Sequence, residues 1–410
     1  MPLVLYLLGL AVFAQGTSEF MLSGLVSDIA ADLDVSVPAA GSLTSAFAVG
    51  MIVGAPLAAV LGMRSRRRAL LAFLVTFLLA HMAGALTTSY GVLLATRVVS
   101  ALANAGFLAV ALATATSLVA PDAKGRATSV LLGGTTLACV AGVPGGALLG
   151  QVWGWRAAFW AVALVSLPAV VAVARSVPAD TADRAPADAR AELGALRSPR
   201  LLVTLLLGAL VNGATFCAFT YLEPLATHVT GVSQAWLPGL LALFGLGSFA
   251  GVALGGRVAD RRPVPLLVAG SLALLAGWAA FALTAHHPVA TVAFTFALGT
   301  LSFAVGSTLI ARALYAATGA PTLGGAFATA AFNVGAALGP WAGGRAIDAG
   351  LGYRSPLWVS ALLVALALLT AGAAALRAGR RGPGVTPAPE RTSVPPRPWT
   401  AQGSPRAPRP

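Results

Sequence analysis

The sequence predicts an all-α integral membrane protein with 12 transmembrane helices in two pseudo-symmetric halves of six helices. Composition is the first indication, because the 410 residues are 58% hydrophobic and only 10% charged, whereas soluble proteins carry about 25% charged residues. Apolar runs of about 20 residues, each long enough to cross the hydrocarbon core, recur along the whole chain. Matching motifs at one fixed offset then indicate that the second half repeats the first.

Twelve apolar runs define the predicted helices. Arg residues cluster between the runs, and Trp and Tyr lie near run ends, as loop charges and interfacial anchors do. The expected helices span residues 3–29, 39–61, 69–86, 90–119, 127–149, 157–174, 201–221, 237–255, 264–284, 289–315, 323–347 and 356–375.

The domain organisation follows from the same pattern. Residues 1–174 are predicted to form an N-terminal six-helix bundle, and residues 201–376 a C-terminal one. The stretch 175–200 mixes charged residues, Pro and Ala, which indicates a cytoplasmic linker with a short amphipathic helix. Residues 377–410 are rich in Pro and Arg and cannot bury a core, so we expect a disordered cytoplasmic tail.

The net charge of +13 reflects membrane topology rather than a nucleic-acid partner. With both termini in the cytoplasm, 22 of the 26 Lys and Arg residues lie on the inner side; Arg156, Arg345 and Arg354 lie outside, and Arg97 lies within a span. Basic residues are enriched in cytoplasmic loops of membrane proteins. The sequence therefore predicts a multi-pass protein of the cytoplasmic (inner) membrane, in contact with the lipid bilayer and with no nucleic acid.

The two halves correspond at an offset of 198 residues. GWRAAFW at 154–160 matches GYRSPLW at 352–358, and the glycine pair at 145–146 matches the pair at 343–344. Duplicated halves around a central site are typical of secondary transporters, in which one half rocks against the other. At this offset, Glu19 of the first half corresponds to the uncharged Cys217.

Glycine recurs every four residues in two of the spans. The two series are Gly142, Gly146 and Gly150 in the fifth span and Gly335, Gly339 and Gly343 in the eleventh. Residues four apart share a helix face, so these faces should let a neighbouring helix approach closely. Pro144, followed by Gly145, should bend the fifth span, and Pro340 lies beside the second series.

A charged loop follows the eighth span. In GGRVADR at 255–261, Gly256 permits close packing, and Asp260 with Arg261 is expected to form a charge latch between helices at the inner face. The equivalent loop of the first half has Gly62 in place of the aspartate, which argues against a matching latch there. The alternative is an ordinary charged loop.

Two charged side chains lie within spans. An ionised group at the depth of Glu19 costs about 3 kcal/mol or more, so we interpret Glu19 as a functional residue. Loss of hydration favours the neutral carboxyl, which makes Glu19 a candidate proton carrier; the approach of Arg97 would favour release of that proton. The alternatives are that Glu19 is a packing residue and that Arg97 snorkels near the cytoplasmic face.

Several of these stretches resemble the major facilitator superfamily. Gly256, Asp260 and Arg261 match its Gly-x-x-x-Asp-Arg element, Arg97 resembles the arginine of its fourth helix, and the fifth-span glycines with their proline resemble the signature of its drug exporters. GTSEF at 16–20 resembles the start of its chloramphenicol-exporting drug:proton antiporters, and it resembles the sugar and arabinose exporters almost as well. The resemblance extends through all twelve spans. It implies the major facilitator fold and proton-coupled efflux, by alternating access, of a small amphiphilic drug such as chloramphenicol or a related phenicol.

Such a drug would need a pocket with aromatic walls and a few polar groups. The candidates that should face the centre are Phe20, Asn104, Asn212, Phe216, Tyr221, Phe332 and Asn333. Glu223, at the end of the seventh span, is expected to be an outer gate or interface residue. Asp28, Asp32 and Asp34 are expected to be solvated at the outer end.

Other classes of protein fit the sequence less well. The four histidines form no metal-spaced set with acids, which argues against a membrane-embedded metalloenzyme. Both cysteines lie inside apolar spans, which argues against a disulfide or a metal cluster. Duplicated halves and a lone coupling acid argue against a channel. We expect a functional monomer without metal or cofactor, and export of sugars or nucleosides is the alternative function.

Truncation after Gly382 tests whether the tail is dispensable. We expect the shortened chain to export drug as the full chain does, because a Pro-rich segment that buries no core adds nothing to the bundle. Drug accumulation in cells that express either chain at equal membrane abundance measures this. A large rise in accumulation with the truncated chain would show that the tail is needed.

Overall fold

The computed structural model describes residues 3–60, 65–177, 192–258, 263–317, 320 and 323–380. Within these ranges the chain is helical and contains no sheet. Eleven helical segments of this part are long and apolar enough to cross a membrane, and α15, with 23 residues, adds a twelfth. The prediction of twelve spans is confirmed.

Nine of the spans are single helices, and three are interrupted. The single helices are α3 (Val37–Val60), α4 (Arg66–Leu86), α5 (Tyr90–Ser117), α8 (Trp155–Ser176), α12 (Leu237–Val258), α13 (Pro263–Thr284), α14 (Pro288–Ala316), α15 (Gly324–Ala346) and α16 (Ser355–Arg380). The first interrupted span consists of α1 (Leu3–Phe20), η1 (Met21–Gly24) and α2 (Val26–Asp32). The fifth span consists of α6 (Lys124–Leu137), η3 (Ala138–Gly142) and α7 (Val143–Trp153). In the seventh, the spanning helix is α10 (Pro199–Thr220), and after an interruption at Tyr221 the chain continues beyond the span as α11 (Leu222–Leu225) and η5 (Ala226–Thr230). Short turns connect them at η2 (Pro121–Ala123), η4 (Gly194–Arg197), η6 (Gln234–Trp236) and η7 (Ile347–Leu351).

The first span breaks where a continuous helix over 3–29 is predicted. Leu25, between η1 and α2, has φ −132° and ψ 0°, and its N–H donates to the carbonyl of Leu22. The chain is tightly packed here, since a Cβ on Gly24 would lie 2.8 Å from a methyl of Leu241 and 2.9 Å from Cβ of Ala147. The continuous helix is therefore wrong in its last third, and the break follows directly after the turn that carries Glu19.

The fifth span bends through a π-helical turn, η3. Pro144 has no N–H to donate to the preceding turn, so the regular helix cannot run through it undisturbed. α7 then begins at Val143, with Pro144 in its first turn, where the missing N–H costs least. Single π-helical turns of this kind are frequent at functional sites.

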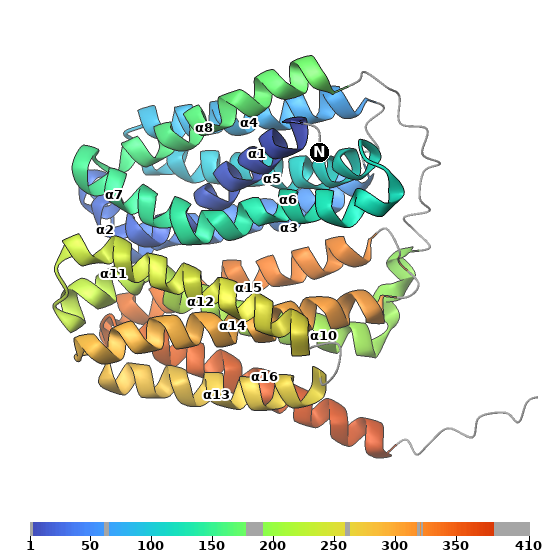
Figure 1. Ribbon diagram of the computed structural model, residues 1–410. Coiled ribbons are helices and arrows are strands. Elements are labelled where there is room, and N and C mark those ends of the chain that lie inside the picture. The colour runs from blue at the N-terminus through green and yellow to red at the C-terminus, as the bar shows by residue number, and fades with distance from the viewer. Residues whose placement is uncertain are drawn as a thin grey trace, which may run out of the picture.

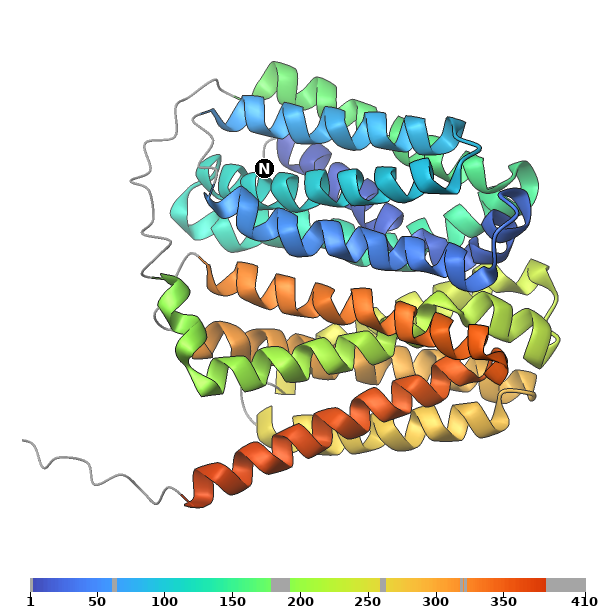
Figure 2. The ribbon, with the colours of Figure 1, turned by 180° about the vertical axis from the view of Figure 1, so that it is seen from behind.

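The helices form two bodies that lie one above the other (Figure 1), and the view from behind shows the same division (Figure 2). The upper body holds α1 to α8, and the lower body holds α10 to α16. The start of α1, the end of α8, the start of α10 and the end of α16 lie at one end, here called the terminal face. α2 and α11 lie at the other end, here called the opposite face.

The two bodies meet along two pairs of helices. α3 packs on α15, and α7 with η3 packs on α12. One hydrophobic cluster crosses this boundary and includes Phe20 and Val143 from the first half with Phe216 and Leu241 from the second. The boundary is therefore packed beside the end of α1.

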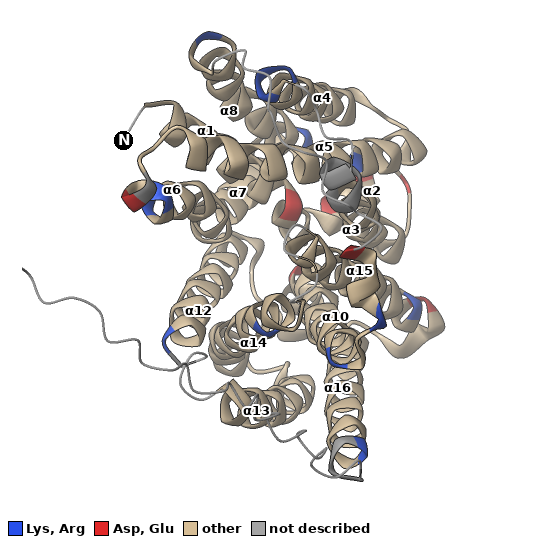
Figure 3. Ribbon diagram, turned by 90° about the vertical axis from the view of Figure 1, so that its right-hand side faces the viewer, with Lys and Arg blue, Asp and Glu red and all other residues tan. Residues whose placement is uncertain are grey.

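Basic residues gather at the terminal face, onto which Figure 3 looks. Lys and Arg lie there at the ends of several helices, as Arg66 does at the start of α4, Arg257 near the end of α12 and Arg377 near the end of α16. This is the distribution expected of a cytoplasmic surface.

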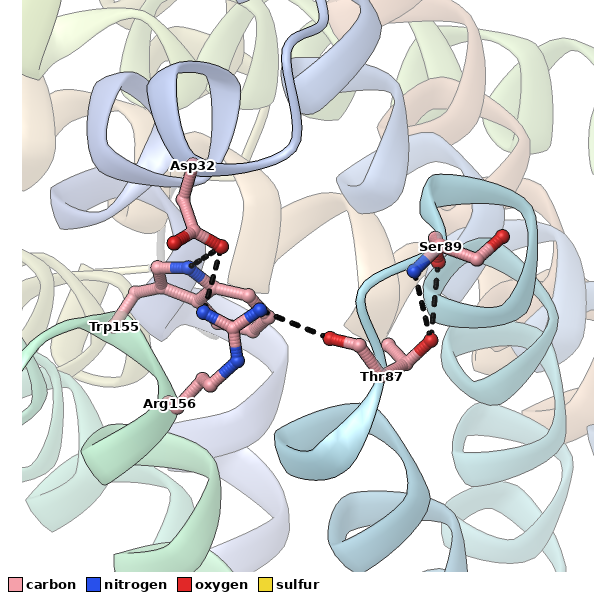
Figure 4. Close-up of polar contacts among 5 residues, drawn as sticks. All are labelled: Asp32, Thr87, Ser89, Trp155 and Arg156. Atoms are coloured by element: carbon pink, nitrogen blue, oxygen red, sulfur yellow. Dashed lines mark hydrogen bonds and ion pairs between the residues drawn. The ribbon is translucent and has the colours of Figure 1, made fainter.

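An ion pair on the opposite face joins α2 to α8 (Figure 4). Arg156 Nη1 lies 2.6 Å from Asp32 Oδ2, and Arg156 Nη2 donates to the carbonyl of Thr87 at 3.0 Å. The indole N–H of Trp155 donates to the same carboxylate at 3.3 Å. Asp32 is therefore paired with Arg156 while it stays exposed to solvent, as expected at the outer end. The cluster connects the ends of α2, α4 and α8.

Replacement of Arg156 by Ala should lower the stability of the first half slightly. Both partners of the ion pair are partly exposed, at 30% and 42%, so its contribution is about 1 kcal/mol or less. We expect a small decrease in Tm of the purified protein in detergent. Arg354→Ala is the matched control, because Arg354 occupies the equivalent position and makes no ion pair within the described ranges. Equal Tm values for the two variants would contradict a stabilising role for the cluster.

Candidate functional site

Arg97 lies in the third turn of α5 and is buried, with 1% of its side chain exposed. Its Nη1 donates to Ser18 Oγ and its Nη2 to the Ser18 carbonyl, each at 2.8 Å. The guanidinium also lies over the ring of Phe47, 4.4 Å from its centre. The snorkelling alternative is wrong, because the charge turns inward to α1 and lies nearer the opposite face than the terminal face.

His81 of α4 extends this contact, and the sequence analysis did not assign it a role. Its Nε2 lies 2.7 Å from Ser18 Oγ, and its Nδ1 lies 2.8 Å from the carbonyl of Phe77. The imidazole is 1% exposed. The sequence does contain an indication of this contact, which is a histidine within an apolar span. A buried polar ring needs a hydrogen-bond partner, so such a histidine predicts a contact with another polar group.

Glu19 follows Ser18 in the last turn of α1. Ser18 and Phe20 are buried, whereas Glu19 remains partly exposed. No residue in the described ranges forms an ion pair with its carboxylate, although the charge of Arg97 lies close enough to attract it. A carboxyl near a positive charge, but not tied to it, can exchange its proton without breaking a direct ion pair.

Gln15 lies one turn before this group, on the arc of α1 that carries Ser18 and Glu19. It is 1% exposed, and neither atom of its amide has a hydrogen-bond partner within the described ranges. A buried amide without a protein partner usually binds water or a ligand. Gln15 is therefore a second residue that the sequence analysis missed.

The glycine series of the fifth span packs against the helix that carries Glu19. Its contacts pair Gly142 with Thr17, Gly146 with Met21 and Gly150 with Leu25. A Cβ on Gly142 would overlap the Thr17 side chain, so glycine is required for this approach. Gly145 is directed elsewhere, since a Cβ there would touch nothing within 4 Å.

The second half repeats this packing between α15 and α10. The close contacts pair Gly335 with Ala209, Gly339 with Gly213 and Gly343 with Cys217. Cys217 is fully buried, and its thiol donates to the carbonyl of Pro356 at 3.3 Å. Pro340 lies inside α15 without ending it. The position that corresponds to Glu19 thus serves packing in the second half.

Aromatic rings lead from Glu19 across the boundary between the halves. Phe20 stacks on Phe216, with 5.5 Å between ring centres, and meets the edge of Phe219 at 6.3 Å. Phe219 in turn stacks on Phe244 at 4.2 Å. Two predicted pocket residues, Phe20 and Phe216, therefore lie in contact although they come from different halves.

The other predicted pocket residues are dispersed. Asn104 is buried two turns beyond Arg97 on α5. The Asn212 amide donates to the carbonyl of Phe332 at 2.8 Å, and the Asn333 amide to the carbonyl of Thr329 at 2.9 Å. In this conformation the two amides of the second half hold helix backbones.

Tyr221 lies at the boundary between the halves and is 1% exposed. Its hydroxyl donates to the carbonyl of Pro340 at 2.9 Å. The same hydroxyl would lie 2.6 Å from a Cβ on Gly41 of α3, so the two halves touch here without space for a ligand.

The motif after the eighth span is described only in part. Gly256 lies in the last turn of α12, and a Cβ there would contact nothing within 4 Å. Asp260 and Arg261 lie outside the described residues.

Side chains of one half form hydrogen bonds to groups of the other at three places within the described ranges. All of these bonds lie toward the opposite face of the molecule, away from the terminal face. They join Ser27 to Glu223, Ser45 to the Ala337 carbonyl and Gln151 to the Gln234 carbonyl. The Ser27 hydroxyl donates to Glu223 Oε2 at 2.5 Å, and the Ser27 N–H donates to the same oxygen at 3.3 Å. The structure is therefore closed at the opposite face.

Glu223 is the buried acid of this closure, at 3% exposure, and lies in α11 beyond the spanning helix α10. Burial raises the pKa of its carboxyl above the usual value, although the hydrogen bonds from Ser27 act in the other direction. Asp28 also raises that pKa, and His228 lowers it. Glu223 should therefore bind a proton at a higher pH than an ordinary glutamate does.

Known proteins share both the sequence and the fold. The profile of the Major Facilitator Superfamily matches residues 8–328. A chloramphenicol resistance protein of Streptomyces lividans is 57% identical over 90% of this chain and 96% of its own length. A chloramphenicol efflux pump of Mycobacterium tuberculosis is 32% identical over 89% of this chain and 90% of its own. A solved bacterial homolog of the lysosomal transporter Spinster, inward-facing and unoccupied, has a TM-score of 0.71 at 19% identity, over 90% of this chain and 95% of that one.

Two six-helix bodies, packed along a shared boundary and closed at one end, define the architecture of a secondary transporter. The chain belongs to the Major Facilitator Superfamily. It is a membrane transporter and not an enzyme.

Glu223→Ala should open the opposite face. A hydrogen bond to a charged group stabilises by about 1.5–3 kcal/mol, so its loss should raise the open population roughly tenfold or more. Distances between spin labels on cysteines at Asp34 and His286 report the opening.

Acid should have the reverse effect on the parent chain. Since burial raises the pKa of Glu223 in the closed form, a proton binds more tightly to the closed form than to an open form in which this carboxyl is hydrated. The open population should therefore fall as the pH is lowered through the raised pKa, and Glu223→Ala should remove this response. Unchanged distances in Glu223→Ala would contradict the role of this contact.

Proposed function

We propose that the protein exports a small, neutral, amphiphilic drug in exchange for protons, with chloramphenicol or a related phenicol as the substrate. The observation that supports this most is the state of Glu19. It is a partly exposed carboxyl within a spanning helix, beside a buried arginine but not in an ion pair with it. Such a group can be neutral or charged at modest cost, which a proton carrier requires.

The proton would act by changing the charge balance of the first half. With Glu19 ionised, its charge offsets that of Arg97, and the carboxylate favours a state of the two halves that admits water to it. With Glu19 protonated, the carboxyl is neutral, and the free energy of closing the halves around it falls. Drug and proton would therefore favour different states of the two halves, which couples their movements.

The proton gradient supplies enough free energy for this exchange. One proton that enters at about 100 mV releases roughly 2.3 kcal/mol, and a unit pH difference adds about 1.4 kcal/mol. For a neutral drug exchanged one for one, the sum sustains a gradient of a few hundredfold. A neutral drug also needs no second acid, in agreement with the buried Cys217 at the position equivalent to Glu19.

The substrate class rests on the relatives and on the aromatic contact beside Glu19. Relatives named for chloramphenicol resistance and chloramphenicol efflux match nearly the whole chain. Phe20 and Phe216 would separate when the halves move, and their faces would then be free to stack on an aromatic ring. Asn104, Asn212 and Asn333 would supply polar contacts, and Gln15, one turn before Glu19, has an amide without a partner in the described part of the chain. Export of sugars or nucleosides is the alternative, because the GTSEF stretch at 16–20 resembles exporters of that kind almost as well.

The proposed orientation places the terminal face in the cytoplasm and both termini inside. The basic residues of that face support it. The halves 1–174 and 201–376 would then rock about their boundary as two units, within a monomer in the inner membrane. The closure through Ser27 and Glu223 would seal the outer side in the present state.

Glu19→Gln should abolish drug-driven proton movement in vesicles that contain the purified protein, because the amide cannot release a proton. The amount of folded protein should not change. A pH-sensitive dye inside the vesicles measures the exchange. Asp34→Asn is the matched control, since it removes an exposed carboxylate from the same half. Retained exchange in Glu19→Gln would remove Glu19 from its proposed role.

The substrate itself can be tested in a host that lacks its own pumps. Expression of this chain should raise resistance to phenicols more than to other antibiotics, and collapse of the proton gradient should restore drug accumulation. Resistance restricted to nucleoside antibiotics would favour the alternative substrate class.

A further inference from the structure

A continuous chain of hydrogen bonds joins three helices of the first half. It runs from Arg97 of α5 through Ser18 of α1 to His81 of α4, with distances of 2.8 Å and 2.7 Å, and ends at the Phe77 carbonyl, 2.8 Å from His81. All three side chains are at most 1% exposed. Water therefore does not replace any of these partners.

The chemistry of the two ends fixes the direction of every bond. The Phe77 carbonyl can only accept, so His81 Nδ1 carries a hydrogen and donates to it. Arg97 can only donate, so Ser18 Oγ accepts from it. The Ser18 hydroxyl hydrogen is then directed to His81 Nε2, which accepts only if the imidazole is neutral. Every hydrogen bond of the chain is satisfied in this arrangement.

A charged His81 would disrupt the same arrangement. Its Nε2 would become a donor, so Ser18 would receive two donors and lose the acceptor for its own hydrogen. A charged His81 would also place a second positive charge near Arg97, with only the Ser18 hydroxyl between them. The rings of Phe77 and Phe159, which pack against His81, offer that charge no polar partner. The geometry therefore requires a neutral imidazole.

We propose that His81, as a neutral acceptor, is a positioning residue that holds Arg97 beside Glu19 through the Ser18 hydroxyl. The proposal rests on the proton-coupled function above. With His81 as the acceptor of its hydrogen, the Ser18 hydroxyl presents its oxygen to Arg97 Nη1, while the Ser18 carbonyl accepts from Nη2. His81 therefore determines how Nη1 of the guanidinium is held. His81 itself carries no proton in the exchange.

The test compares two substitutions of His81 that differ in whether they can accept a hydrogen bond. His81→Phe fills the space but leaves the Ser18 hydrogen without an acceptor. Loss of the buried acceptor leaves the guanidinium less firmly held beside Glu19, so the maximal rate of drug-driven proton exchange should fall roughly tenfold. His81→Gln keeps an acceptor oxygen and should retain most of that rate. The drug concentration for half-maximal exchange should change less than about twofold in both, since neither substitution touches the pocket.

A matched control separates this effect from a general loss of packing. Thr114→Val removes a buried hydroxyl of α5 that bonds only to the backbone carbonyl of Val110. It should leave the exchange rate unchanged. If His81→Phe does not fold, Ser18→Ala provides the smaller change and should produce the same loss of rate.

The combination of Ser18→Ala with His81→Phe tests whether His81 acts through Ser18. The double variant should exchange protons no more slowly than Ser18→Ala alone, because the connection is already cut. Additive losses would overturn the proposal. Equal losses in His81→Gln and His81→Phe would also overturn it, since His81 would then be needed as a titrating group.

Glu19→Gln in the same assay distinguishes failure of this inference from failure of the proposed function. If Glu19→Gln abolishes exchange while His81→Phe exchanges at the parent rate, only the positioning role of His81 is refuted. If Glu19→Gln retains exchange, the proton-coupling role of Glu19 is refuted whatever His81 does.

Discussion

The fixed position of the Arg97 guanidinium is the constraint on which the rest of the site depends. Its two bonds to Ser18 place a permanent positive charge inside an apolar bundle, directly beside the turn that carries Glu19. An isolated charge there would be costly, and the carbonyl, the hydroxyl and the Phe47 ring offset part of that cost. Glu19 makes no ion pair with Arg97 within the described residues, so it can change its protonation state without breaking a direct contact.

Close helix packing provides the frame for this charge. The glycine face of the fifth span packs against the first span at Thr17 of α1, just before Glu19, and at Met21 and Leu25, which follow α1. The second half uses the same device between α15 and α10, but Cys217 takes the place of the acid. The duplicated plan therefore gives both halves the same helix packing, whereas the buried arginine and the carboxyl beside it belong to the first half. Movement of either half changes the surroundings of Glu19.

The architecture could be predicted from the sequence because the bilayer imposes a length on every apolar run. The interruptions could not, since the break at Leu25 depends on how closely Leu241 and Ala147 approach Gly24. Glu19 and Arg97 were found because a charge in an apolar span is conspicuous. His81 was missed because an imidazole can be neutral, and its role depends on a serine 63 positions away. The ion pair of Asp32 could not be predicted for a similar reason, since Arg156 reaches it only in the folded chain.

Infrared difference spectroscopy of the purified protein tests the central claim most directly, because the C=O stretch of a protonated carboxyl is separate from the bands of the ionised group. Addition of chloramphenicol near neutral pH should remove such a band from the parent chain, as Glu19 releases its proton when the drug binds. The same addition to Glu19→Gln should leave that region of the spectrum unchanged. A band that persists when the drug is bound, or one that disappears equally in both proteins, would contradict the account.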